Sequence, residues 1–135
     1  MIRIFTPPDI DRILEIEAQA FPKSPYNQHI FTSLYRSNAT TFLVYEEEEI
    51  LGYLIHTREG HIISIAVDPR HRRKGIGTQL VKDVFRNSTG EFVWVEVRET
   101  NVGAQVFYEK LGFRRKGVIA KYYRTEDAYI MVRQW

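Results

Sequence analysis

The apolar positions of this chain follow two periods, and together they predict both strands and helices. Apolar runs that alternate or continue without interruption predict seven strands, over residues 2–5, 41–45, 50–56, 61–67, 92–97, 113–123 and 127–133. Apolar residues spaced by three and four positions predict four helices, over residues 7–21, 27–36, 75–86 and 101–111. The two element types are therefore mixed along the chain.

Signals at the helix ends support these boundaries. Thr6 followed by Pro7 is typical of a helix start, with Thr6 as the N-cap and Pro7 at the first helical position. Asn101 is the expected N-cap of the last helix, and Gly112 is its expected C-terminal stop.

One connection decides the type of sheet. Strand 61–67 reaches strand 92–97 through a helix, and such a crossover joins parallel strands. The three strands from residue 41 to residue 67 form a meander, which is antiparallel. The sequence therefore predicts an α+β fold with a mixed, mostly antiparallel sheet of about seven strands and helices on both faces. All 135 residues are expected to form a single domain.

The composition excludes several classes of protein. There is no cysteine, which excludes disulfides and thiolate nucleophiles, and the four histidines lack the spacing of metal ligands, so no metal is expected. A formal net charge of +2 provides no strong field for nucleic acid. No run approaches the roughly 20 apolar residues of a membrane span, and the N-terminus lacks a signal-peptide core. We therefore expect a cytoplasmic protein without a nucleic-acid or membrane partner.

A basic glycine loop (residues 70–78) follows the fourth predicted strand and carries the pattern Arg72-x-x-Gly75-x-Gly77. Glycines allow close approach of a ligand, and the first turn of the next helix has unpaired N–H groups, so this segment predicts a phosphate site. A solvated basic loop, a nucleic-acid patch or a localisation signal are alternatives. No lysine separates Gly77 from Thr78, as a P-loop requires, and Leu80 stands where a dinucleotide motif has Gly or Ala.

Two further side chains carry candidate chemistry. Alternation along strand 92–97 puts Glu96 beside Trp94 on one face, near the carboxyl end of a strand that we expect to be buried on both faces. Ligands of open sheets bind outside such strand ends, so Glu96 is a candidate catalytic carboxylate; pairing with Arg98 or solvent is the alternative. Tyr108 is either a core aromatic or a catalytic hydroxyl.

Four ordered motifs between residues 61 and 131 closely resemble the RimI-type N-terminal protein acetyltransferases of the GNAT superfamily. They are Ile65-Ala66-Val67-Asp68-Pro69 before the glycine loop, Val95-Glu96-Val97-Arg98 with Asn101, Phe107-Tyr108-Glu109-Lys110-Leu111-Gly112-Phe113, and Tyr122-Tyr123 with Glu126-Asp127-Ala128. The glycine loop itself resembles the acyl-CoA pyrophosphate loop of this superfamily. Before residue 60 only Ala20-Phe21-Pro22 and Ser24 resemble the family.

The resemblance implies acetyl-CoA as co-substrate and an expected role for each matching position. The main chain of Ile65 and Val67 would hold the acetyl thioester and the pantetheine arm, which Asn101 would also contact. Glu96 matches the general base, and Tyr108 matches the general acid toward the leaving thiolate. The pyrophosphate would lie against Arg72, Arg73, Lys74, Gly75, Ile76, Gly77 and Thr78. The acceptor peptide would lie between two loops that contain Phe21, Tyr26, Tyr122 and Tyr123.

Reference pKa values favour an N-terminal acceptor. An α-amino group, with a pKa near 8, is roughly 10% neutral at pH 7, whereas a lysine, near 10.4, is below about 0.1%. For such an amine, deprotonation by Glu96 through an ordered water is then sufficient. A leaving thiolate with a pKa of about 8.5, against about 10 for tyrosine, makes Tyr108 a hydrogen-bond donor with late or concerted proton transfer. Without a cysteine to carry the acetyl group, we expect direct attack in a ternary complex.

The leading hypothesis is therefore acetylation of a protein's N-terminal α-amino group, with a ribosomal protein as one candidate acceptor. A GNAT enzyme that acetylates lysine side chains or a small-molecule amine is the alternative. A nucleic-acid-binding or CoA-sensing module that uses the basic loop is a non-enzymatic alternative, which the low net charge disfavours. The physiological acceptor and the oligomeric state do not follow from the sequence.

Overall fold

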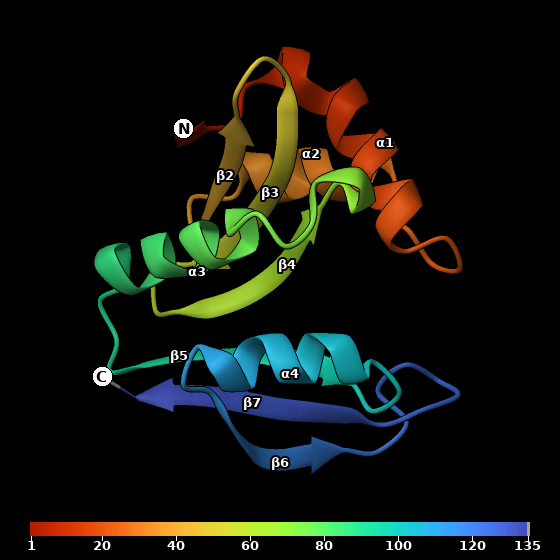
Figure 1. Cartoon of the computed structure of the whole chain (residues 1–135), viewed down its shortest axis with the longest axis vertical. Helices are drawn as coiled ribbons and strands as arrows, with labels where there is room; N and C mark the ends of the chain where they lie inside the picture. Colours follow the sequence, from red (N-terminus) through yellow and green to blue (C-terminus); the bar gives the residue numbers. More distant parts are fainter. Residues whose placement is uncertain (135) are drawn as a thin grey trace.

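The computed structural model describes residues 1–134, which form a seven-stranded sheet in the order β1-β2-β3-β4-β5-β7-β6 (Figure 1). The strands are β1 (Ile2–Ile4), β2 (Thr40–Glu46), β3 (Ile50–Thr57), β4 (His61–Val67), β5 (Phe92–Arg98), β6 (Arg114–Ile119) and β7 (Ala128–Gln134). The helices are η1 (Pro7–Asp9), α1 (Ile10–Ala20), α2 (Gln28–Arg36), η2 (Pro69–His71), α3 (Ile76–Asn87) and α4 (Val102–Lys110). None of these helices combines the length and the apolar character that crossing a bilayer requires.

The sheet is mixed, as the crossover through α3 predicts. Among the described residues β4 and β5 are the parallel neighbours, and the other neighbouring strands are antiparallel. The parallel pair is short, because it joins only His61 to Trp94 and Ile62 to Val95. Beyond these residues β4 and β5 diverge toward their carboxyl ends (Figure 1).

Each face of the sheet has its own hydrophobic cluster. On one face Leu80 of α3 and Tyr108 of α4 are buried against the central strands. On the other face Ile13 of α1 and Phe31 of α2 are buried against a cluster that includes Tyr53 of β3. The prediction of an α+β sheet with helices on both faces is therefore confirmed, and Figure 1 shows α3 and α4 on the near side.

The predicted helix caps are confirmed where their geometry is specific. The Asn101 Oδ1 atom accepts the Ala104 N–H at 3.0 Å, and Gly112 ends α4 with a φ of 89°. At the first helix the chain turns once as the short helix η1 after Thr6 before α1 begins. At this helix start the Asp9 carboxylate accepts the Thr6 N–H at 2.8 Å.

The predicted strand over residues 113–123 is too long. Strand β6 ends at Ile119, and the chain then enters the β6–β7 loop (residues 120–127). Lys121 and Arg124 have positive φ angles of 53° and 66°, and the Lys121 N–H donates to Asp127 Oδ1 at 2.9 Å. This side-chain acceptor replaces a strand partner and closes the loop, which the apolar pattern alone does not reveal.

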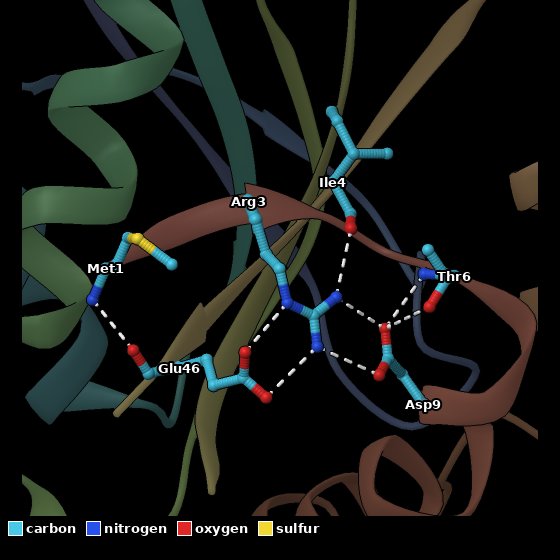
Figure 2. A network of polar contacts seen from close by, with 6 residues as sticks. All are labelled: Met1, Arg3, Ile4, Thr6, Asp9 and Glu46. Carbon is cyan, nitrogen blue, oxygen red and sulfur yellow. Dashed lines mark hydrogen bonds and ion pairs between the residues drawn. The ribbon is translucent and has the colours of Figure 1, made fainter. Parts of the chain in front are cut away.

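A charged network fixes the N-terminal strand (Figure 2). The Arg3 guanidinium donates to both oxygens of Asp9 at 2.8 and 3.0 Å and to those of Glu46 at 2.9 and 3.2 Å. Arg3 thereby lowers the pKa of the Asp9 carboxyl. The network joins β1, η1 and the end of β2.

Candidate active site

The divergence of β4 and β5 leaves main-chain polar groups of β4 without a strand partner. On the side of β5, residues 63–67 have no ladder partner in the described part of the chain. Ile65 and Val67 lie in this stretch, and their side chains pack against the cluster under α3 and α4. The opening between the strands therefore presents N–H and C=O groups that a polar ligand arm can pair with.

The glycine loop has the backbone geometry of an anion site. Arg73 and Gly75 adopt left-handed φ angles of 64° and 80°, and Gly75 is the N-cap of α3. The Gln79 N–H donates to the Gly75 carbonyl at 3.0 Å, so the amides of residues 76–78 precede the first helical hydrogen bond. The side chains of residues 72–74 are exposed and basic. Free amides at a helix start beside cationic side chains suit a phosphate group.

Asp68 fixes the segment that leads into the glycine loop. Its side chain is fully buried at 0% exposure and accepts hydrogen bonds from Arg12 at 2.6 Å and from the Arg70 guanidinium at 2.9 Å. These donors, Arg70 foremost, hold the pKa of Asp68 well below its usual range. Arg12 also donates to the Ile50 carbonyl at 2.8 Å, so α1, β3 and the loop are held together.

Glu96 forms a hydrogen-bonded pair with His61. The distance between Glu96 Oε2 and His61 Nε2 is 2.7 Å, and the side chains are 16% and 28% exposed. The His61 ring stacks on Trp94, with ring centroids 5.1 Å apart and planes 3° from parallel. The parallel register of His61 with Trp94 causes this arrangement, because it puts the start of β4 beside the Glu96 face of β5.

One alternative and one expectation for Glu96 are wrong. The alternative was pairing with Arg98, whereas the side-chain partner is His61. Strand β5 is also buried on one face only, because Phe92 is 42% exposed while Val93 on the other face is fully buried. Glu96 lies on the less buried face, where Trp94 and Glu96 are half-buried, while Val93, Val95 and Val97 on the opposite face belong to the cluster under α3 and α4.

Tyr108 combines a core ring with a hydroxyl that is free for a ligand. The residue is 3% exposed, and its ring meets Phe107 and Phe113 edge-on at 5.0 and 5.1 Å. Burial raises the pKa of the hydroxyl, and Tyr123 adds to this rise. Within residues 1–134 the hydroxyl forms no hydrogen bond. A hydroxyl that no protein group engages can donate to an acceptor on a ligand.

Three tyrosines from two loops lie near Glu96. Tyr26 belongs to the α1–α2 loop (residues 21–27), and Tyr122 and Tyr123 belong to the β6–β7 loop. Burial is the main cause of the raised pKa of each hydroxyl, which reaches about 12 for Tyr123, and the charge of Glu96 contributes in all three. A carboxylate with several hydroxyls within electrostatic range suits a polar acceptor such as a peptide end.

The β5–α4 connection holds the β6–β7 loop in place. The Arg98 guanidinium lies 4.0 Å from the centroid of the Tyr123 ring, and the Tyr123 hydroxyl donates to the Glu96 carbonyl at 3.4 Å. The Glu126 carboxylate accepts hydrogen bonds from the Thr100 hydroxyl at 2.7 Å and from its N–H at 3.2 Å. The loop is thus anchored beside Glu96.

The remaining predicted site residues have structural contacts. Asn101 caps α4 through Oδ1, while its Nδ2 forms no hydrogen bond within residues 1–134. Phe21 is partly buried against the cluster under α1 and α2. In the described part of the chain no group of three or more His, Asp or Glu side chains is arranged to hold a metal ion.

Sequence reasoning missed two polar residues beneath the α1–α2 loop. Glu17 is 2% exposed, accepts the Tyr26 N–H at 2.8 Å and is hydrogen-bonded to the Tyr53 hydroxyl. A signal was present in the sequence, because Glu17 interrupts the apolar stripe of α1 that includes Ile13. A carboxylate on a buried helix stripe indicates a specific partner.

Residues 10–113 match the acetyltransferase (GNAT) family, which is more than half of the chain. The chain belongs to the GNAT acetyltransferase family. This GNAT acetyltransferase is 35% identical to an uncharacterised N-acetyltransferase of Methanocaldococcus jannaschii, over 99% of this chain and 91% of the relative. It is 32% identical to an N-alpha-acetyltransferase of Saccharolobus solfataricus, over 93% of this chain and 87% of the relative.

Solved structures agree with the family. The crystal structure of the ribosomal-protein-S18-alanine N-acetyltransferase from Escherichia coli superposes on the GNAT acetyltransferase described here with a TM-score of 0.86 and 26% identity, over 99% of this chain and 92% of that one. The chain is therefore an acetyl-CoA-dependent acetyltransferase. The family match ends at Phe113, so strands β6 and β7 with Tyr122 and Tyr123 lie outside it.

Proposed function

We propose that this GNAT acetyltransferase transfers the acetyl group of acetyl-CoA to the N-terminal α-amino group of a protein, by direct attack in a ternary complex. The observation that carries the proposal is the Glu96–His61 pair, which lies within electrostatic range of three tyrosine hydroxyls from two loops. A positioned carboxylate beside hydrogen-bonding groups supplies both a base and a binding site for an amine. The Saccharolobus solfataricus relative, named an N-alpha-acetyltransferase, supports an N-terminal acceptor.

The chain's residues fit acetyl-CoA in three places. The unpaired main chain around Ile65 and Val67 suits the acetyl-pantetheine arm, and Asn101 Nδ2 is available to the same arm. The pyrophosphate would be held by the glycine loop and the start of α3, through Arg72, Arg73, Lys74, Gly75, Ile76, Gly77 and Thr78. When bound, acetyl-CoA supplies an activated acetyl thioester.

Glu96 is the base in this proposal and accepts the proton that the acceptor amine loses, directly or through a water. The hydrogen bond from His61 holds Oε2, while Oε1 forms no hydrogen bond within residues 1–134. Because roughly 10% of an α-amino group is neutral at pH 7, mild assistance is sufficient. His61 orients the carboxylate rather than replacing it.

Tyr108 donates a hydrogen bond to the leaving sulfur. Burial raises the pKa of its hydroxyl, so complete proton transfer to a thiolate is less favourable than from an exposed tyrosine. A fixed donor in a buried site stabilises developing charge without full transfer. Tyr108 therefore acts mainly as a hydrogen-bond donor.

The acceptor would bind between the α1–α2 and β6–β7 loops, where Tyr26, Tyr122 and Tyr123 offer hydroxyls and Phe21 offers an apolar edge. The Escherichia coli structure, described as a ribosomal-protein-S18-alanine N-acetyltransferase, makes a ribosomal protein with an N-terminal alanine one candidate acceptor. A lysine acceptor is disfavoured because below about 0.1% of lysine is neutral at pH 7.

A peptide panel tests the proposal. Peptides that differ in their first residue are offered with acetyl-CoA, each with a free and with a chemically blocked N-terminus, and products are weighed by mass spectrometry. We expect a mass increase of one acetyl group on free peptides only. Acetylation that persists on blocked peptides would instead identify a lysine acetyltransferase.

A further inference from the structure

Glu17 is a buried carboxylate that the catalytic proposal does not use. It lies on the sheet side of α1 at 2% exposure, in the same cluster region as Ile13 and Ile16. One oxygen, Oε2, accepts the Tyr26 N–H at 2.8 Å. The other, Oε1, accepts the Tyr53 hydroxyl, and the same hydroxyl lies 2.9 Å from Ser64 Oγ on β4.

All of these partners are neutral. Within residues 1–134 Glu17 forms no ion pair, and burial raises the pKa of its carboxyl against the opposing hydrogen bonds from Tyr26 and Tyr53. A buried acid without a cation is unfavourable compared with an apolar side chain of similar size. We therefore expect Glu17 to have a role other than filling the core.

The position of the α1–α2 loop depends on this carboxylate. The remaining hydrogen bonds of the loop in the described chain are local, such as the Phe21 N–H to the Glu17 carbonyl at 2.8 Å and the Ser24 N–H to the Phe21 carbonyl at 3.2 Å. The bond from Tyr26 to Glu17 therefore joins the end of the loop, just before the N-cap of α2, to the side chains beneath it. Tyr53 and Ser64 extend this link to β3 and β4.

The Tyr26 hydroxyl lies within electrostatic range of Glu96. The Tyr26 ring meets Phe31 edge-on at 5.7 Å, which fixes the ring plane. The charge of Glu96 and the neighbouring Tyr122 both influence the Tyr26 hydroxyl. A shift of the Tyr26 backbone would therefore move a hydroxyl within the acceptor site.

We infer that Glu17 is a positioning residue for the acceptor: its carboxylate holds the Tyr26 main chain and thereby sets the shape of the peptide site. The inference rests on the proposed function, because that function makes Tyr26 an acceptor contact. Within residues 1–134 none of the side-chain hydrogen bonds of Glu17 involves the glycine loop or Tyr108. Loss of the Glu17 carboxylate should weaken binding of the acceptor peptide and leave binding of acetyl-CoA unchanged.

Three variants of the full chain test this inference. Glu17→Ala removes the acceptor of the Tyr26 N–H, and the KM for a peptide should rise on the order of tenfold, the effect of one lost hydrogen bond to a charged group. Glu17→Gln keeps one oxygen that can accept this N–H, while its amide can donate to the Tyr53 oxygen, so its peptide KM should stay within about twofold of wild type. Ile13→Val, one helical turn earlier on the same buried face, is the control for lost packing.

Amide hydrogen exchange in the α1–α2 loop gives a second readout that does not need activity. Faster exchange at Tyr26 in Glu17→Ala, with the KM for acetyl-CoA unchanged and Ile13→Val like wild type, supports the inference. Equal rises of both KM values, or the same peptide KM change in Ile13→Val, would overturn it. If the wild type acetylates no free N-terminus, the proposed function fails, and unchanged exchange at Tyr26 in Glu17→Ala would separately refute the role of Glu17.

Discussion

In the proposed mechanism, Glu96 acts as the catalytic base and His61 positions it. Glu96 supplies the carboxylate, and His61, stacked on Trp94, holds one of its oxygens at 2.7 Å. A side chain with a fixed partner loses less conformational freedom when a substrate arrives. At the residue scale, the proposed mechanism therefore depends on a contact between two neighbouring strands.

Replacing Glu96 by Gln should lower kcat by roughly 10²-fold, because the amide cannot accept the amine proton. The Kd for acetyl-CoA, measured by calorimetry, should stay within about twofold. Glu91→Gln, an exposed acid just before the same strand, is the matched control and should behave as wild type. Unaltered turnover of Glu96→Gln across the pH range would remove Glu96 as the base.

Replacing Tyr108 by Phe should depress kcat by roughly tenfold to a hundredfold, since the ring packing remains and only the hydrogen-bond donor is lost. Steady-state rates and acetyl-CoA binding, measured side by side, should show a larger effect on kcat than on affinity. A variant with the wild-type rate would show that Tyr108 is a core aromatic and nothing more.

The candidate residues themselves were predictable, but their partners were not. Strand alternation and the motifs pointed to Glu96 and Tyr108, because those signals are local in the sequence. The bond to His61 depends on the register between β4 and β5, which no local pattern encodes. Glu17 and Tyr53 are likewise paired only by the packing of α1 on β3.

At the scale of elements, the glycine loop is held by a charge buried below it. Asp68 connects this loop to α1 through Arg12, so the loop enters α3 from a fixed starting point. The pKa of Asp68 is lowered chiefly by Arg70. A lowered carboxyl pKa contributes stability above the ordinary value near 4, and this stability is lost as the pH falls through the folded-state value.

Replacing Asp68 by Asn should therefore lower the free energy of unfolding at pH 7 by about 2–4 kcal/mol. The reason is that Arg12 would then face a buried side chain that carries no negative charge. Below about pH 4 the wild type should lose this advantage, so the two stability curves should converge. Urea unfolding between pH 7 and pH 2 measures both curves. Parallel curves would contradict the account, and exposed Asp11→Asn serves as the control.

Most element boundaries follow from apolar period and caps, whereas the β6–β7 loop does not. The residues after Ile119 are still mostly apolar or aromatic, so the pattern extends the strand to Tyr123. The loop forms because Asp127 accepts the Lys121 N–H and Glu126 binds Thr100. Such contacts between separate segments override local preference.

At the scale of the whole molecule, one parallel connection in an otherwise antiparallel sheet creates the site. The sequence predicted this topology, because a helix between two strands implies a crossover. The sequence does not reveal that β4 and β5 diverge after two residue pairs. This divergence leaves the main chain around Ile65 and Val67 unpaired on the side of β5. In the proposed function, the cofactor and the acceptor meet at the carboxyl ends of these strands.

The most direct test uses one peptide that carries both a free N-terminus and an internal lysine. It is incubated with acetyl-CoA and either the wild type or Glu96→Gln, and fragment masses locate the acetyl group. The account predicts acetylation of the α-amino group alone, and its near-complete loss in Glu96→Gln. Acetyl groups on the lysine, or equal N-terminal acetylation by both proteins, would contradict it.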